Sequence, residues 1–502
     1  MPDAAGDVDR ITWNLSQGEP DTLDPHASVT FSSGQVVNNV CDALLAYQPD
    51  FSIKPGIATA EEISDTEIVY TIREGATFSD GSPITATDVV FSLERAASPD
   101  SVIAYAFANV GSIDAVSDRQ VRVVLIKPDV LFSRAMATVA GVILKKDWVE
   151  AAPNSVGTPS GGLVCSGPFV LEEWRSGNSI ELRRNENYWD ADKRPHAQTV
   201  EFQFITDASA MTQALSAGDI DGSYDLPATS IPILRNSDAG QLVFGPSTSG
   251  FSMSLARPDG PLSDPDLRNA LQLMIDRESL AEVVFNGAAS PGFTHLTQGT
   301  WPAAERDIYE TASKQFEDER TFDMDAAKAL VEKSSYSGAT VVLAIPAGND
   351  TSSRAAQLIQ QQAKQIGIDM SIESLQPLIW LQSGYDPAAR EGLDLLLSDS
   401  FNSSPSPLEP LFFLFMPGES YNYTQFDDPR VTALLEQARE TTDPRASAEL
   451  VVQAQKIYES ASTAIPLLNT YSTMFINSRL TGAVTSVAFW SMPQMAYVGA
   501  AG

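Results

Sequence analysis

Histidine and cysteine, which supply most protein zinc ligands and many catalytic groups, are scarce in this chain. His26, His196 and His295 lie far apart, without the His-x-x-x-His spacing that places two ligands on one helix face. No serine stands in a Gly-x-Ser-x-Gly frame, and no glycine-rich phosphate loop precedes a helical pattern. Among 65 carboxylates, some pair will resemble a glycosidase pair by chance, so such a pair is no evidence for a glycosidase. We therefore expect no enzyme, no catalytic residue, no metal site and no cofactor.

The two cysteines, Cys41 and Cys165, are too few for a four-ligand zinc site. Two readings remain open, a disulfide and a pair of buried free thiols. A disulfide would close a long loop, and the chain-entropy model gives such a cross-link roughly 5 kcal/mol of stabilisation.

Charge and composition restrict the class of partner. The net charge of −33 disfavours binding to nucleic acids and to anionic membrane surfaces. It is compatible with cationic or zwitterionic ligands. A hydrophobic content of 43% fits a folded globular protein, and no apolar run reaches the length of a membrane span. We expect a small-molecule or peptide ligand and no nucleic acid.

The segment from residue 68 to residue 95 predicts a strand, a turn and a capped helix. Ile68–Ile72 is rich in β-branched and aromatic residues, which favour a strand. Phe78–Gly81 contains the Asp-Gly pair of a turn. Thr85 and Asp88 have the spacing of a capping box, followed by apolar residues at helical spacing.

The amino-acid sequence of this segment resembles the signature of the family 5 solute-binding proteins, the extracytoplasmic receptors of peptide, nickel and related ABC importers. That signature reads roughly R-x-G-x-x-F-x-D-G-x-P-x-T-A-x-D-V-x-x-S-x-x-R. We interpret the matching residues as a folding module rather than as ligand contacts. They are Arg73, Gly75, Phe78, Asp80, Gly81, Pro83, Thr85, Ala86, Asp88, Val89, Ser92 and Arg95.

Further blocks extend the resemblance along the chain. Ser166–Phe169 and Arg184–Trp189 resemble the family's T-G-P-Y/F and R-N-x-x-Y-W elements. Leu215–Asp221 resembles L-x-x-G-x-I-D, and Arg268–Gly287 resembles the block that opens the second lobe.

Local patterns outside these blocks predict further elements. Residues 32–47 read as one helix from their apolar spacing. A strand over 341–345, a helix over 351–366 and a strand over 368–372 indicate a βαβ unit and a partly parallel sheet. Asn349 precedes that helix, and we favour capping over ligand binding for its side chain.

The resemblance implies an α/β fold of the periplasmic-binding-protein-like type II class (cluster C). Two large lobes joined by hinge strands would close around a ligand in the cleft, and the first lobe would carry an extra subdomain. The implied divisions are lobe I over 1–46, 164–249 and 472–502, the subdomain over 47–163, and lobe II over 250–471.

The resemblance also implies a location and partners. We expect a monomer outside the cytoplasm that acts with the membrane permeases of an ABC importer. The N-terminal residues Met1–Asp7 lack the features of a signal peptide, so either the protein is cytosolic or a targeting segment is missing from this sequence. The resemblance favours the second alternative, a missing secretory or lipoprotein leader.

The ligand contacts follow from the resemblance to peptide-binding relatives. These have a tryptophan after a second-lobe strand, matched here by Trp380, and a later W-x-x-D-x-x-D-P block whose first aspartate binds the peptide's α-ammonium. A loose alignment places Asn402 at the position of that aspartate and Asp399 at the tryptophan. A neutral amide would then replace the charged anchor, unless Asp399 substitutes.

Other residues complete the expected site. Aromatic rings such as Trp380, Tyr385 and Phe401 could stack on a ligand, including the face of a sugar, or pack in the core. The remaining candidates, for which loop or core packing is the alternative, are Ser400, Phe251, Tyr423, Asn422, Tyr105 and Asp24.

These expectations define three functions. The favoured one is the solute-binding component of an ABC importer, with an oligopeptide as ligand. The same component could instead bind a carbohydrate, an opine-like conjugate or a modified peptide. A sensory receptor or chaperone on the same fold is the alternative from another class.

Overall fold

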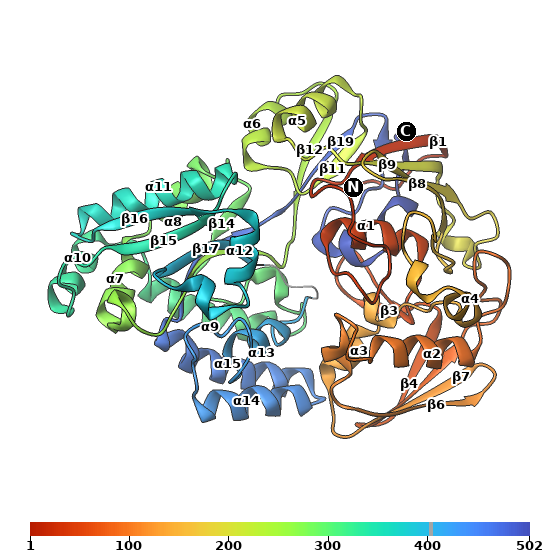
Figure 1. The fold of residues 1–502 in the computed structure, drawn as a ribbon, viewed down its shortest axis with the longest axis horizontal. Coiled ribbons are helices and arrows are strands. Elements are labelled where there is room, and N and C mark those ends of the chain that lie inside the picture. Colours follow the sequence, from red (N-terminus) through yellow and green to blue (C-terminus); the bar gives the residue numbers. More distant parts are fainter. Residues whose placement is uncertain (401–404) are drawn as a thin grey trace. The chain divides into compact units, whose positions relative to one another are not determined.

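The computed structural model describes residues 1–400 and 405–502, apart from the side chain of Asp192. The chain folds into two compact units, shown as a ribbon in Figure 1. Unit 1 comprises Met1–Pro246 and Ser472–Gly502, and unit 2 comprises Ser247–Tyr471. Within the described residues, no helix has the length and apolar character needed to cross a membrane.

A mixed sheet forms the centre of unit 1. Its strand β1 (Val8–Asn14) runs parallel to both of its neighbours, β10 and β11, while the other described pairs are antiparallel. Ile11 and Trp13 of β1 are fully buried. The strand order is β12 (Gly240–Gly245), β19 (Ser472–Asn477), β11 (Gly222–Tyr224), β1, β10 (Ala197–Gln203), β9 (Ser179–Arg184) and β8 (Phe169–Arg175).

A second, antiparallel sheet of unit 1 carries the signature segment. Its order is β4 (Ala58–Ser64), β5 (Glu67–Ile72), β7 (Gln120–Leu125) and β6 (Val110–Ser117). The helix α2 (Ala86–Ala96) begins at Thr85 with the predicted capping box, because Thr85 and Asp88 each accept a hydrogen bond from the other's backbone N–H. Val89 and Leu93 of α2 are fully buried in the hydrophobic cluster of this sheet.

Short elements complete unit 1. The described helices besides α2 are α1 (Phe31–Val40), α3 (Val130–Ala135), α4 (Lys146–Ala151), α5 (Ala208–Ala217) and α6 (Ile231–Leu234). Two small strand pairs are β2 (Leu45–Tyr47) with β3 (Ile53–Pro55), and β20 (Leu480–Thr481) with β21 (Gly499–Ala500).

The helix predicted over 32–47 is wrong in its second half. Helix α1 ends at Val40, and Cys41 has the extended dihedral angles φ −123° and ψ 134°. Leu45–Tyr47 forms strand β2 instead, because it pairs with β3. The helical spacing of Ala43 and Leu44 continued past the point where the backbone changes direction.

Unit 2 is built on one mixed sheet. The predicted βαβ unit is confirmed, since β15 (Val341–Pro346) and β16 (Met370–Leu375) are parallel and the helix α11 (Asp350–Gln365) connects them. Asn349 caps α11, accepting a hydrogen bond from Ser352 N at 2.9 Å. The strand order is β14 (Ala289–Pro291), β18 (Ala464–Thr470), β13 (Gly250–Leu255), β17 (Leu395–Ser400), β15 and β16.

Helices bury the sheet of unit 2. Those described, besides α11, are α7 (Pro265–Met274), α8 (Arg277–Val283), α9 (Arg306–Glu319), α10 (Met324–Lys333), α12 (Pro377–Ser383), α13 (Glu409–Phe415), α14 (Pro429–Glu440) and α15 (Pro444–Ala461). Three of them start at an Asp-Pro pair, where the aspartate caps the helix and proline is its first residue.

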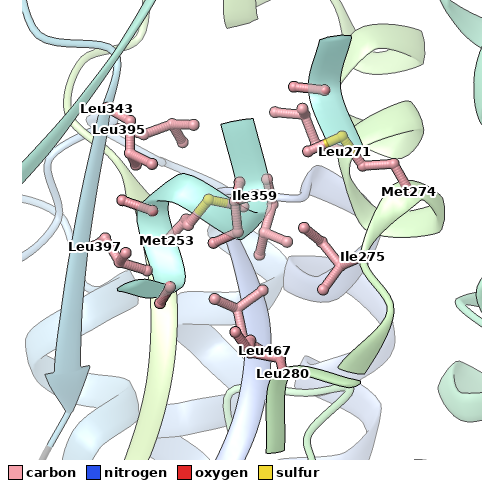
Figure 2. Packing of buried hydrophobic residues seen from close by; sticks show 14 of the residues in the cluster. Met253, Leu271, Met274, Ile275, Leu280, Leu343, Ile359, Leu395, Leu397 and Leu467 are labelled. Atoms are coloured by element: carbon pink, nitrogen blue, oxygen red, sulfur yellow. The ribbon is translucent and has the colours of Figure 1, made fainter. Parts of the chain in front are cut away.

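The two faces of this sheet carry different clusters, because side chains alternate along a strand. Leu343 and Leu395 lie in the large core, which also contains Leu271 and Met274 of α7 and Ile359 of α11 (Figure 2). The smaller cluster on the other face contains Ala256, Ala344, Leu375, Leu393 and Leu396. This second face supports the candidate site.

Candidate ligand-binding site

Trp380 is fixed on the second face of the unit 2 sheet. It lies in α12, a short helix that follows β16 and begins with Pro377. Its half-buried side chain packs against the cluster of Ala344 and Leu396, together with Tyr423. Two predicted ligand contacts, Trp380 and Tyr423, are thus more than forty residues apart in sequence but pack on the same hydrophobic cluster.

Tyr385 joins the same group of rings. Its hydroxyl lies 3.0 Å from the hydroxyl of Tyr421, and the two ring centroids are 5.7 Å apart. The rings of Tyr421 and Tyr423 are 6.2 Å apart. We call Trp380, Tyr385, Tyr421 and Tyr423 the aromatic cluster.

Much of the aromatic cluster and of helix α12 faces solvent. Tyr385 is 59% exposed, and Leu378 and Leu381 of α12 are 65% and 61% exposed. Large contiguous apolar patches on soluble proteins often mark binding sites, whereas single exposed apolar side chains are common. This surface therefore offers apolar and aromatic contacts to a partner or ligand.

A buried arginine lies beneath the cluster. The guanidinium of Arg390 stacks on the ring of Tyr423, with its central carbon 4.3 Å from the ring centroid. Its Nε donates to Ala256 O at 3.0 Å and its Nη1 to Ser383 O at 2.6 Å, at the end of α12. Burial lowers the pKa of Arg390, which nevertheless remains a cation at neutral pH.

Three predicted contacts lie where strands β13 and β17 pair. Phe251 is opposite Asp399, and Gly250 is opposite Ser400. Phe251 is 1% exposed and packs edge-to-face on Phe285, so its ring belongs to the core. Asp399 and Ser400 are exposed, and the Ser400 hydroxyl donates to Gly250 O at 3.3 Å. Phe401 and Asn402 lie outside the described residues.

Asn422 closes the loop between α13 and α14. Its amide nitrogen donates to Met416 O at 3.1 Å and to Phe426 O at 2.7 Å, and its oxygen accepts from Phe426 N at 2.8 Å. These bonds use the side chain to hold the loop that carries Tyr421 and Tyr423. Its role here is to position the two rings.

Of the two predicted contacts of unit 1, Asp24 is held next to His26. Asp24 is buried in a two-bond ion pair with Arg95, one bond being 2.8 Å. The His26 ring nitrogen Nδ1 accepts from Arg95 at 2.9 Å, and burial lowers the pKa of His26 to about 3. The exposed Tyr105 follows Val102, whose N–H donates to His26 O at 3.2 Å.

Several signature residues hold the second sheet of unit 1 in place. Arg95 forms the ion pair with Asp24, and the hydroxyl of Ser92 bridges Asp88 O and the backbone of Leu144. Gly81 adopts a φ of +84°, which favours glycine. These contacts are those of a folding module.

Cys41 and Cys165 are joined in a disulfide. The bond links the end of α1 to the segment that precedes β8. Next to it, the Asp42 carboxylate accepts hydrogen bonds from Trp189 Nε1 at 2.9 Å and from Tyr188 Oη at 3.1 Å. Burial raises the pKa of Asp42 to about 6.

Arg390 and Tyr421 were not among the predicted contacts. One signal for Arg390 was present, since it is the sole arginine between Arg354 and Arg430 in an acidic chain and lies between the predicted residues Tyr385 and Asp399. Tyr421 stands two residues before Tyr423, but sequence spacing outside regular structure gives no direction to a side chain.

Comparison with known proteins identifies the family. The family model for bacterial extracellular solute-binding proteins, family 5 (middle), matches residues 52–422. The glutathione-binding protein GsiB of Salmonella typhi is 25% identical over 492 residues, covering 95% of this chain and 91% of GsiB.

Two solved structures are similar in fold. The ABC transporter substrate-binding protein CtaP of Listeria monocytogenes superposes with a TM-score of 0.84 at 19% identity, covering 98% of this chain and 99% of CtaP. The oligopeptide-binding protein AppA of Bacillus subtilis, solved with a nonapeptide, gives 0.81 at 20% identity, covering 99% and 100%. They confirm the expected two-lobe α/β fold. The chain belongs to the bacterial extracellular solute-binding proteins of family 5.

Proposed function

We propose that this protein captures a small peptide-like solute outside the cytoplasm and delivers it to the permease subunits of an ABC importer. Family membership supports the solute-binding role. The name of GsiB and the nonapeptide bound to AppA support a peptide-like ligand.

The observation that carries this proposal is the aromatic cluster on unit 2. Trp380, Tyr385 and Tyr423 were expected to contact ligand, and they gather on one face of the sheet with Tyr421. Flat rings that are half-buried or exposed provide a large contact area with little loss of side-chain entropy. Such a surface suits the side chains and planar peptide bonds of a short peptide.

The remaining features of the expected role belong to the same proposal. The protein acts as a monomer, performs no covalent chemistry and is held at the outer face of the membrane as a lipoprotein. The lobe and subdomain boundaries expected from the sequence, with closure around the ligand, describe how capture would occur.

Mass spectrometry of small molecules released by denaturing the purified protein tests this proposal. Each molecule found, with glutathione and a set of di- to pentapeptides, is then titrated in a thermal-shift assay. A ligand of the native state raises the melting temperature as its concentration exceeds Kd. Stabilisation by peptides or glutathione is expected. Stabilisation by sugars or opine-like conjugates alone would replace the peptide assignment. If no small molecule stabilises the protein, the proposal that it captures a solute is contradicted.

A further inference from the structure

Arg390 is a buried cation that lacks a carboxylate partner within the described residues. Only 6% of the surface of Arg390 is exposed to solvent. Asp386 acts on it electrostatically but forms no ion pair with it, and the Asp386 carboxylate instead accepts from Ala388 N at 2.9 Å. Burying an unpaired charge is costly, so such groups usually have a counter-ion.

The other buried arginines of unit 2 differ from Arg390 in their surroundings. Arg320 is paired with Glu459 at 2.7 Å. Arg277 makes its hydrogen bonds to backbone carbonyls and to the Gln272 side chain, with both Nη atoms and Nε engaged. Among these three buried arginines of the described chain, Arg390 alone has neither a carboxylate partner nor hydrogen bonds from all its nitrogens, although the less buried Arg268 shares both features.

The unused donors of Arg390 lie on its outer nitrogens. A guanidinium has five N–H donors. Within the described residues Arg390 uses two of them, one on Nε and one on Nη1, both for backbone carbonyls. The rest of Nη1 and all of Nη2 remain without a protein acceptor there. Two adjacent nitrogens of a guanidinium match the two oxygens of a carboxylate.

The position of Arg390 connects this charge to the aromatic cluster. Its guanidinium stacks on Tyr423, and the carbonyl that fixes Nη1 is that of Ser383, two residues before Tyr385. A ligand on the cluster would therefore lie beside a preorganised cation.

We propose that Arg390 binds a carboxylate of the ligand, so that the protein selects carboxylate-bearing peptide-like molecules with an aromatic or apolar group, whether or not they have a free ammonium. This inference rests on the proposed function, because it assigns a ligand class to the same site. The aromatic cluster contacts the apolar group of the ligand, and the guanidinium of Arg390 beneath it binds the ligand's carboxylate.

Matched probes test the carboxylate directly. Titration calorimetry on the full chain compares N-acetyl-tyrosyl-alanine, which has a carboxylate and no ammonium, with its C-terminal amide, which has neither. The third probe is tyrosyl-alanine amide, which has only the ammonium. We expect the acid to bind at least about tenfold more tightly than either amide, a difference of about 1.4 kcal/mol.

A variant pair assigns the effect to Arg390. In Arg390→Gln the acid should lose its advantage over the amide, while Arg306→Gln should keep it. Arg306 is a suitable control because it also lies over a ring of unit 2, 6.0 Å from that of Trp301, but is exposed to solvent. Circular dichroism and urea unfolding establish that both variants fold.

The outcomes separate this inference from the proposed function. Equal binding of the acid and its amide to the unmodified protein overturns the inference, even if Arg390→Gln fails to fold. So does absence of binding by the acid, tighter binding of the ammonium probe, or an advantage retained in folded Arg390→Gln. In each case capture itself still stands if the purified protein releases a small molecule that restabilises it.

Discussion

The guanidinium of Arg390 stacks on the ring of Tyr423 at 4.3 Å and joins the end of helix α12 to Ala256, the residue that follows strand β13. This contact links three separate segments of unit 2 and orders the support of the aromatic cluster. Cation–π contacts of a partly desolvated arginine stabilise by roughly 0.5–2 kcal/mol. The same residue thus positions the rings and supplies a positive charge beside them.

Removing an exposed ring should weaken ligand binding without unfolding the protein. Tyr385→Ala is expected to weaken binding of the ligand recovered from the protein by about tenfold, roughly 1.4 kcal/mol. Because Tyr385 is 59% exposed, its free energy of unfolding should change little. Titration calorimetry and urea unfolding measure the two quantities. Phe322→Ala removes another exposed ring of unit 2 and should leave affinity unchanged; equal affinity losses would argue against a specific role for Tyr385.

Loss of the disulfide should destabilise unit 1. Cys41 and Cys165 are 124 residues apart in sequence, and the chain-entropy model gives roughly 5 kcal/mol for a loop of this length. The double variant Cys41→Ser, Cys165→Ser should unfold at lower urea concentration than the oxidised protein. The reduced wild-type protein is the control and should behave like the double variant. An unchanged midpoint would show that the cross-link adds nothing to stability.

The carboxyl group of Asp42 should make stability fall as the pH rises from about 4 to about 6. Its pKa in the folded protein is raised by burial from 3.8 to about 6. The folded state therefore holds this proton more tightly than the unfolded state, and the stabilisation present below pH 3.8 is lost as the pH passes through 6. Urea unfolding across this range should show a steeper decline for the wild-type protein than for Asp42→Asn. If the unfolding free energies of the two proteins change with pH in parallel, Asp42 does not have the raised pKa.

Glu459 should have the opposite pH dependence. Burial raises its pKa, but the charges of His295 and Arg320 outweigh burial and lower it from 4.5 to about 2. Its stabilisation is thus present above pH 4.5 and is lost as the pH falls through 2. Glu459→Gln leaves Arg320 without its ion pair at 2.7 Å, which should cost roughly 3–5 kcal/mol at neutral pH.

A matched substitution isolates this effect of Glu459. Glu449→Gln changes an exposed residue of the same helix, α15, and should alter the free energy of unfolding by less than about 0.5 kcal/mol. Chemical denaturation at neutral pH compares the two variants. Similar unfolding free energies for both would mean that the buried ion pair is not a net support of unit 2.

Local chemistry explains which elements could be predicted from the sequence. The capping box of Thr85 and Asp88, the Asp-Pro helix starts and the cap at Asn349 depend on residues within one turn of each other. The sequence blocks that resemble family 5 made the overall fold predictable, because they occur at several points along the chain. Trp380, Tyr385 and Tyr423 lie together in the structure, while the ligand contacts expected of them from the sequence remain a prediction.

Contacts between distant segments explain what could not be predicted. Helix α1 ends early where Cys41 meets Cys165. Asp24 is engaged by Arg95, 71 residues away, and Arg390 is fixed by Ala256, 134 residues away. No local pattern contains these pairings.

The most direct test of the account follows the indole of Trp380 while ligand binds. The protein labelled with 5-fluorotryptophan should give resonances from its seven tryptophans, and Trp380→Phe identifies the one from Trp380. The account predicts that the ligand recovered from the native protein shifts the Trp380 resonance in proportion to occupancy. A ligand that stabilises the protein thermally but leaves this resonance unchanged would show that the aromatic cluster is not where the solute binds.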